Sequence, residues 1–211
     1  MGRPAKFDAD SLLDSALAVV ARRGRAATVA EVAAQAGARV GSVYYRFPTR
    51  EILMAALWVR SIHRFHAALL AAVNQPDDPR QALAAGAVLI VRYCREHPDE
   101  ARAMTLYRHP ELLRRLQDAD PELRDCPDQL RSDLLTLNNE VYAVLTDLTV
   151  RAFGSDQALG YVRVAVLQTA YGLVRPYLAD LPEPMPPWLE DLVAAMVPAA
   201  LAQLPACTGP R

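Results

Sequence analysis

The sequence predicts an all-α protein of about nine to ten helices. Apolar residues recur at intervals of three and four, the period of a helix that buries one face. No stretch combines alternating apolar and polar residues with turn dipeptides, so no sheet is expected. From residue 78 onward, proline is repeatedly accompanied by an acidic residue, a combination typical of helix starts. These pairs are Asp78-Pro79, Pro98-Asp99, Pro110-Glu111, Pro121-Glu122 and Pro127-Asp128.

The first predicted helix covers residues 8–23. Asp8 can cap its start, because an aspartate side chain accepts a backbone N–H that has no helical partner. Gly24 follows at its end. The apolar residues of this segment lie on one face of the helix: Leu12, Leu13, Ala16, Leu17 and Val20.

Two short helices follow, at residues 28–36 and 40–46, and they form the centre of the sequence. Thr28 and Glu31 have the spacing of a capping box, in which each side chain binds the other residue's backbone N–H. Gly37 stands where the first of these helices must stop and can take the left-handed conformation that ends a helix. Val43 and Phe47 are spaced as core anchors of the second.

The second short helix leaves Arg39, Ser42, Tyr45 and Arg46 facing outward. A helix held by its neighbour, with cationic, hydroxyl and aromatic groups on its outer face, suits the major groove of DNA. The alternative is a plain helical hairpin whose arginines are solvated. The spacing of apolar residues does not distinguish the two interpretations.

The particular residues favour the first interpretation. The strings Ala36-Gly37, Gly41 to Tyr45, Phe47-Pro48 and Thr49-Arg50-Glu51 resemble the helix-turn-helix of TetR-family transcriptional regulators over about residues 7–57. The resemblance implies a DNA-binding domain at residues 1–50 and an effector-binding and dimerisation domain at residues 51–211. The candidate DNA contacts are Thr28, Arg39, Gly41, Ser42, Tyr44, Tyr45, Arg46, Thr49 and Arg50.

Two positions differ from the usual family pattern, which has Val-Ser where this chain has Ala38-Arg39. Arginine cannot accept a backbone N–H, so the second short helix lacks the serine cap. Arg39 is therefore expected to reach a phosphate. Arg50 lies in the first turn of the next helix, predicted at residues 49–72, where the helix dipole disfavours a cation. We interpret Arg50 as a phosphate clamp.

The charge distribution agrees with DNA binding. Residues 1–50 contain eight Lys or Arg and four acidic residues, whereas the whole chain has a net charge of −1. The excess of +4 at one end therefore faces −5 over the remainder, and a basic module on an acidic body is typical of DNA-binding proteins. The first six residues, with Arg3 and Lys6, are either a disordered tail or an arm that touches DNA.

No sequence feature indicates an enzyme. The three cysteines, Cys94, Cys126 and Cys207, are widely spaced and are expected to be reduced thiols in the cytoplasm. His63 and His66 are three residues apart, but no further ligand stands beside them, so no metal or other cofactor is expected. No apolar run is long enough to span a membrane, and no signal peptide is evident.

Further helices are predicted at residues 79–96, 98–107, 110–118, 127–153, 155–180 and 186–203. Asn138 would lie inside the apolar stripe of the fourth of these. A buried amide costs about 1–3 kcal/mol unless it is hydrogen-bonded. Asn138 therefore bonds a neighbouring helix or meets a ligand.

The last two predicted helices each have more apolar surface than one small domain needs to cover, which is typical of an interface. The family resemblance implies a homodimer through residues 155–203. It also implies a repressor that a small apolar effector releases from a palindromic operator. The candidate effector contacts are Met104, Tyr107, Asn138, Tyr142, Gln168 and Tyr171. The alternative is a helical ligand-binding or scaffold protein whose hairpin does not read DNA.

Overall fold

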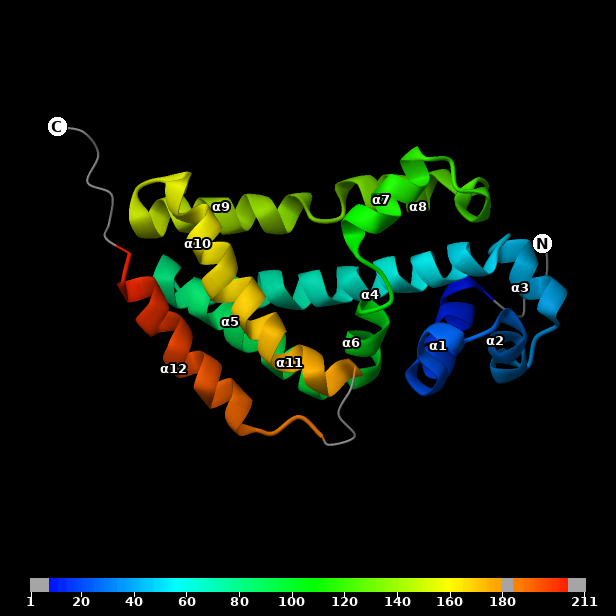
Figure 1. Cartoon of the computed structure of the whole chain (residues 1–211), viewed down its shortest axis with the longest axis horizontal. Helices are drawn as coiled ribbons and strands as arrows, with labels where there is room; N and C mark the ends of the chain where they lie inside the picture. Colours follow the sequence, from blue (N-terminus) through cyan, green and yellow to red (C-terminus); the bar gives the residue numbers. More distant parts are fainter. Residues whose placement is uncertain (1–7, 180–183, 205–211) are drawn as a thin grey trace, which may run out of the picture. The chain divides into compact units, whose positions relative to one another are not determined.

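The computed structural model describes residues 8–179 and 184–204, and the regular elements in these ranges are all helical (Figure 1). The all-α class is therefore confirmed. The first helices are α1 (Ala9–Arg23), α2 (Val29–Ala36), α3 (Val40–Arg46), α4 (Arg50–Val73), α5 (Pro79–Glu96) and α6 (Pro98–Met104). The others are α7 (His109–Gln117), α8 (Asp128–Thr136), α9 (Asn139–Phe153), α10 (Leu159–Val162), α11 (Thr169–Ala179) and α12 (Trp188–Ala202). The N-terminal arm and Cys207 lie outside the described residues.

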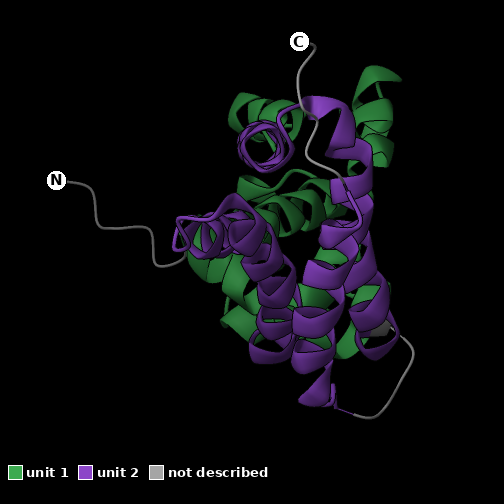
Figure 2. Ribbon diagram, turned by 90° about the vertical axis from the view of Figure 1, so that its left-hand side faces the viewer, with its two compact units in different colours: residues 1–63, 99–137 green, residues 64–98, 138–211 purple. Residues whose placement is uncertain are grey.

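The chain forms two compact units, which Figure 2 shows in different colours. Unit 1 contains residues 1–63 and 99–137, and unit 2 contains residues 64–98 and 138–211. Helix α4 contributes its first turns to unit 1 and its last turns to unit 2. The DNA-binding segment is thus packed together with residues 99–137. The functional boundary expected at residue 50 stays a prediction.

Unit 1 has one continuous hydrophobic core. Helix α1 contacts α2, and α2 contacts α3. The same core includes Leu112 of α7 and Leu134 of α8, both fully buried. The indole Nε1 of Trp58 donates a hydrogen bond to the carbonyl of Met104 at 2.9 Å. The helix-turn-helix therefore shares its core with α6, α7 and α8.

Unit 2 is built around α5, which contacts α9, α11 and α12. A glutamate of α12, Glu190, pairs with Arg95 of α5 at 2.6 Å. The hydroxyl of Tyr161 donates to the carbonyl of Ala200 at 2.9 Å and ties α10 to α12. These two contacts join the elements that the sequence predicts at residues 155–180 and 186–203 to the rest of unit 2.

The predicted helix at residues 127–153 is not continuous, and this prediction was wrong. Helix α8 ends at Thr136 and α9 begins at Asn139, with Asn138 at its N-cap in a non-helical conformation (ψ 0°). Asn138 is half-buried at this break instead of lying inside an apolar stripe. The chain divides here between the two units, so packing overrides a local sequence that contains no glycine or proline.

The predicted helix at residues 155–180 also departs from a regular α-helix. A short 3-10 turn, η3 (Asp156–Ala158), precedes α10. Between α10 and α11, residues Arg163–Gln168 form a π-helical segment, η4. In this segment the Thr169 hydroxyl donates to the carbonyl of Val164, five residues earlier, at 2.9 Å. The helix predicted at residues 155–180 therefore does not keep one helical period along its whole length.

Candidate nucleic-acid interface

Helix α3 is held by two anchors and exposes its other side. Val43 is fully buried and Phe47 is 7% exposed, as their spacing predicts. Tyr45 is 86% exposed and Tyr44 45%. Gly41, Ser42 and Arg46 are also exposed. A row of accessible hydroxyl, aromatic and guanidinium groups on a short helix can contact base edges and phosphates.

The turn before α3 follows the sequence prediction. Gly37 has φ 64° and ψ 26°, the left-handed conformation that ends α2. The N–H of Ala38 then donates to the carbonyl of Ala33 at 2.9 Å, which satisfies a carbonyl at the end of that helix. This geometry fixes the direction in which the chain enters α3.

Helix α3 forms without a side-chain cap. Arg39 occupies the N-cap position with an extended backbone and makes no capping hydrogen bond. The N–H of Ser42 donates to the Arg39 carbonyl at 2.9 Å, so the first turn is closed by the backbone. The Arg39 side chain is exposed and is not needed to start the helix.

Thr28 forms the predicted capping box. Its hydroxyl accepts the N–H of Glu31 at 3.2 Å, and its own N–H donates to the Glu31 carboxylate at 2.9 Å. The Thr28 hydroxyl also donates to the Glu31 carboxylate at 2.9 Å, and this bond together with that of the Thr28 N–H holds the pKa of Glu31 below its ordinary value. The hydroxyl and N–H of Thr28 are both used to cap α2. The residue is nevertheless exposed to solvent.

Thr49 and Arg50 bind groups within unit 1. The Thr49 hydroxyl accepts the N–H of Ile52 at 3.1 Å and donates to the carbonyl of Glu122 at 2.6 Å. The Arg50 guanidinium donates to the carbonyl of Ala27 at 2.8 Å and also to that of Arg25. Arg50 therefore ties the start of α4 to the turn that precedes α2. Its role as a phosphate clamp stays a prediction, and the structure gives its side chain an internal function.

A hydrogen-bonded cluster around Glu51 connects α4 with α7. The carboxylate accepts Arg50 at 2.7 Å, the hydroxyl of Tyr107 at 2.7 Å and Arg115 at 2.9 Å. Burial opposes ionisation of Glu51, but these hydrogen bonds and charges outweigh it and lower the pKa. Burial and the bond to Glu51 raise the pKa of Tyr107. The sequence analysis missed this cluster, because Glu51 and Arg115 are 64 residues apart and no local pattern links them.

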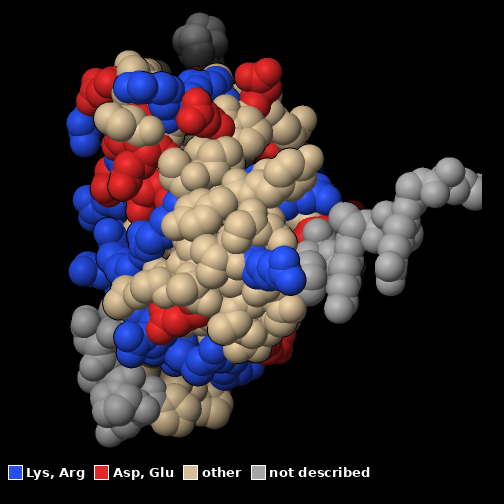
Figure 3. Space-filling model, turned by 90° about the vertical axis from the view of Figure 1, so that its right-hand side faces the viewer, with Lys and Arg blue, Asp and Glu red and all other residues tan. Residues whose placement is uncertain are grey.

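Charged side chains surround a wide uncharged surface on the side of the molecule that is at the right in Figure 1. Figure 3 shows this surface with groups of Arg side chains along its border. Two acidic residues of the N-terminal segment are paired within unit 1: Asp10 and Asp14 both lie within 4 Å of the Arg60 guanidinium, at 3.9 and 2.9 Å. Two of the four acidic residues in residues 1–50 are thus paired with an arginine of α4, which lies outside that segment.

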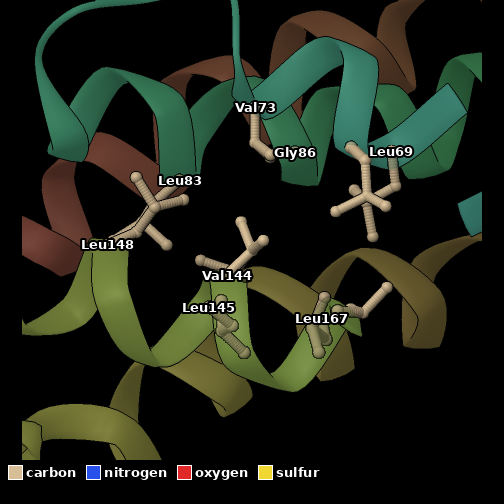
Figure 4. A pocket seen from close by; sticks show the side chains of 11 residues that line it. Leu69, Val73, Leu83, Gly86, Val144, Leu145, Leu148 and Leu167 are labelled. Carbon is tan, nitrogen blue, oxygen red and sulfur yellow. The ribbon is translucent and has the colours of Figure 1, made fainter. Parts of the chain in front are cut away.

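Unit 2 contains an apolar pocket between α4, α5, α9 and η4 (Figure 4). It encloses about 320 Å³, part of which is open to solvent. Leu69 and Val73 come from α4, and Leu145 and Leu148 from α9. All eleven residues that line it are apolar: Leu69, Leu70, Val73, Leu83, Gly86, Val141, Val144, Leu145, Leu148, Val166 and Leu167.

None of the predicted effector contacts lines this pocket. Met104 and Tyr107 belong to unit 1, where Tyr107 binds Glu51. Tyr142 is 43% exposed, with the Arg163 guanidinium 5.3 Å from its ring centre. Gln168 and Tyr171 are exposed, and Asn138 lies at the break before α9. Val141, Leu145 and Leu148 lie on the apolar stripe of the helix predicted at residues 127–153. The apolar residues of this stripe, rather than Asn138, therefore indicate the position of the pocket. The six predicted contacts remain untested as ligand-binding residues.

Residues 8–179 and 184–204 contain no group of three or more His, Cys, Asp or Glu side chains able to hold a metal ion. In the same ranges, no helix is both long and apolar enough to cross a membrane.

The comparisons with known proteins agree with the geometry of α2 and α3. Residues 12–57 match the family model described as bacterial regulatory proteins, tetR family. None of the curated proteins compared with the chain matches it.

Solved structures share the fold. A transcriptional regulator from Rhodococcus sp. Rha1 has a TM-score of 0.68 at 21% identity, covering 93% of this chain and 97% of its own. The fatty acid degradation regulator FadR from Bacillus halodurans has a TM-score of 0.62 at 20% identity, covering 93% and 100%. FadR from Bacillus subtilis, solved with stearoyl-CoA, has a TM-score of 0.55 at 16% identity, covering 97% and 100%.

At these identities the structural likeness establishes the fold, whereas the family model establishes the DNA-binding helices. Residues 12–57 thus form the DNA-binding domain of the tetR family of bacterial regulatory proteins, in a chain that shares the fold of solved transcriptional regulators.

Proposed function

We propose that this protein is a cytoplasmic repressor that binds a palindromic operator as a homodimer and leaves it when a small apolar effector binds. The exposed face of α3 carries the DNA-binding part of the proposal. Tyr45 projects fully into solvent while Val43 and Phe47 fix the helix from behind. Tyr45, Arg46 and Ser42 are the proposed base and phosphate contacts, with Arg39 reaching a phosphate.

Exposed apolar residues on the C-terminal helices support the homodimer. They lie on α10, η4, α11 and α12: Tyr161, Val164, Tyr171, Trp188 and Met196, each more than 40% exposed. Burying this surface against a second copy would remove it from water. Two joined subunits could then hold two recognition helices about one turn of DNA apart.

The apolar pocket of unit 2 supports the effector. Its lining carries no polar side chain, as expected of a site that receives the apolar part of a ligand. Two relatives of the same fold are described as fatty acid regulators or contain stearoyl-CoA, so an elongated hydrocarbon effector is a reasonable class for this pocket.

Helix α4 provides the proposed route from pocket to DNA. It begins at Arg50, beside the DNA-binding segment, and ends with Leu69 and Val73, which line the pocket. A ligand shifts the population of two states only if it binds one of them better. We propose that the effector binds best when the last turns of α4 are displaced.

The test is operator binding by the full-length protein, after genomic footprinting has identified the operator. Tyr45→Ala and Arg46→Ala should each weaken binding, and loss of a base-reading arginine should cost about 1–3 kcal/mol and relax specificity. Arg114→Ala is the matched control, because Arg114 is an exposed arginine of α7 paired only with Asp118 in the described residues. Equal operator binding by wild type, both α3 variants and the control would refute the assignment of α3 as the recognition helix.

A further inference from the structure

Val40, the first residue of α3, is apolar and yet exposed. Its side chain is 41% exposed, whereas Val43, three residues later, is fully buried and holds the helix on the core of unit 1. Val40 is not part of that core. Single exposed apolar side chains are common on protein surfaces, so exposure alone assigns no role to Val40. Its neighbours and its place on α3 must decide.

The neighbours of Val40 leave its outer side open. Gly41 follows it, and no atom lies within 4 Å of a Cβ added there. Tyr44 lies four residues on, hence on the same face of the helix, and is 45% exposed. Val40 and Tyr44 thus form an apolar and aromatic edge of α3. Ser42 and Arg46, also four residues apart and exposed, form a polar edge.

Helix α3 is the element that enters the major groove in the proposed function. It is the second helix of the helix-turn-helix within residues 12–57. In this motif the first residues of the second helix contact base edges. Helix α3 lies at the right in Figure 1, the side on which Figure 3 shows a wide uncharged surface bordered by arginines. Val40 therefore stands where bases are read.

A valine can distinguish bases only by an apolar contact. In the major groove, thymine alone among the four bases presents a methyl group. The isopropyl group of Val40 can neither donate nor accept a hydrogen bond. Over the edge of adenine, guanine or cytosine it would displace water from polar atoms without replacing the lost hydrogen bonds, which is unfavourable. Over the C5 methyl of thymine it would remove apolar surface of both partners from water.

We propose that Val40 reads a thymine in each half-site of the operator, by packing its isopropyl group against the C5 methyl of that base. This inference rests on the proposed function, which places α3 in the major groove. The arginines of the DNA-binding segment supply affinity that depends on salt. Val40 supplies selectivity that does not depend on charge, about fourfold for each methyl group buried.

The test uses the operator identified by footprinting, in which each thymine is replaced in turn, symmetrically in both half-sites, by deoxyuridine. Deoxyuridine pairs with adenine as thymine does and lacks only the C5 methyl. At the position read by Val40, this replacement should weaken binding by the full-length protein about fourfold for each half-site, or about 15-fold in all. At the same position, 5-methylcytosine should bind more tightly than cytosine, because it restores the methyl group. Fluorescence anisotropy measures these affinities.

Variants assign the methyl contact to Val40. Val40→Ala should bind the thymine and deoxyuridine operators equally, with the salt dependence of wild type. Alanine has a higher helix propensity than valine, so α3 should stay folded in this variant. Val150→Ala is the matched control, because Val150 is a valine of α9 that is 42% exposed and lies outside residues 12–57. The control should keep the full discrimination between the two operators.

The remaining outcomes refute the inference in different ways. If Val40→Ala weakens binding to both operators by the same factor and keeps the discrimination, another residue reads the methyl group. If no thymine position distinguishes thymine from deoxyuridine in the wild type, no methyl group is read. In both cases operator binding, and with it the proposed function, stands. If the purified protein protects no specific site in footprinting, the proposed function and this inference both fail.

Discussion

The Glu51 carboxylate of α4 accepts a hydrogen bond from Arg115 of α7 at 2.9 Å, and both side chains are largely buried, at 13% and 17% exposed. Arg115 also donates to Asp120 at 2.7 Å. Glu51 directly follows Thr49 and Arg50, which fix the start of α4. The pair therefore fastens residues 99–137 to the end of the DNA-binding segment.

Removing Arg115 should destabilise unit 1. Breaking a fully buried pair costs about 3–5 kcal/mol, whereas exposed pairs contribute about 0.2–1 kcal/mol. With the side-chain exposures of this pair, Arg115→Ala should lower the free energy of unfolding by about 1–3 kcal/mol. The measurement is urea denaturation followed by circular dichroism.

Arg114→Ala is the control for this prediction. Arg114 is the adjacent residue on α7, and its pair with Asp118 has side chains 66% and 60% exposed. Its loss should cost less than about 0.5 kcal/mol. Similar losses in the two variants would show that the Glu51–Arg115 pair contributes no more than a surface pair.

Acid should weaken the same cluster. The pKa of Glu51 is lowered in the folded protein, so its ionisation stabilises the fold above its unfolded pKa of about 4.3. This contribution is lost as pH falls through the lower, folded pKa. The difference in unfolding free energy between wild type and Glu51→Gln should therefore be constant between pH 7 and 5 and shrink below pH 4. A difference that stays constant down to pH 3 would contradict the lowered pKa.

The dimer should be weakened by a charge at an exposed position of α12. Met196→Lys, at a side chain 42% exposed, should leave the subunit folded and reduce the dimer fraction and operator affinity. Light scattering measures the dimer fraction, and the thermal midpoint shows whether the subunit stays folded. A Met196→Lys protein that remains fully dimeric at micromolar concentration would place the interface elsewhere.

Val193 provides the contrast. Val193 lies on the same helix, but its side chain is fully buried within unit 2. Val193→Lys should therefore lower the thermal midpoint of the subunit itself, because an unpaired charge would be buried. The two variants distinguish an interface position from a core position.

Filling the apolar pocket should abolish the effector response. Gly86 lines the pocket, and a Cβ there would stand 3.0 Å from the Cγ1 of Val73, so Val73 must shift by a few tenths of an ångström. Gly86→Val should bind operator normally and lose its release by apolar ligands such as decanol. Fluorescence anisotropy of labelled operator measures both properties.

Gly160→Ala is the matched control, because no atom lies within 4 Å of a Cβ added there. It should keep the response and gain about 0.5–1 kcal/mol of stability from the loss of glycine in a helix. A Gly86→Val protein that is still released by decanol would exclude this pocket as the effector site.

The sequence predicted the helices whose limits depend on neighbouring residues. Helix α5 begins at Pro79 after the Asp78 cap and ends at Glu96, as the proline and acid pattern indicates. Helices α2 and α3 occupy the predicted segments because Thr28 and Gly37 act within a few residues of themselves. All the residues that form a helix cap or a left-handed turn lie within a few positions of one another, so a short sequence pattern is enough to predict them.

Features that depend on distant residues could not be predicted in this way. The break at Asn138 lies where the chain passes between the two units, and two partners of Glu51 lie 56 and 64 residues away. The same holds for the pocket, whose walls come from four separate segments. Asn138 was predicted as a ligand contact because it is a polar residue in an apolar stretch. The residues that line the pocket are instead the apolar ones of the same stretch, such as Val141 and Leu145.

The π-helical segment η4 sets the phase of the longest element of unit 2. Along residues 159–179, in addition to Ala165, buried residues recur at every fourth position: Val162, Val166, Ala170, Val174 and Leu178. In an α-helix of 3.6 residues per turn, such a series would drift by about 40° at each step and leave the buried face within four steps. The wider turns of η4 absorb part of this drift. Deleting one residue between Arg163 and Gln168 would therefore rotate Ala170, Val174 and Leu178 away from the core, although none of these side chains would change.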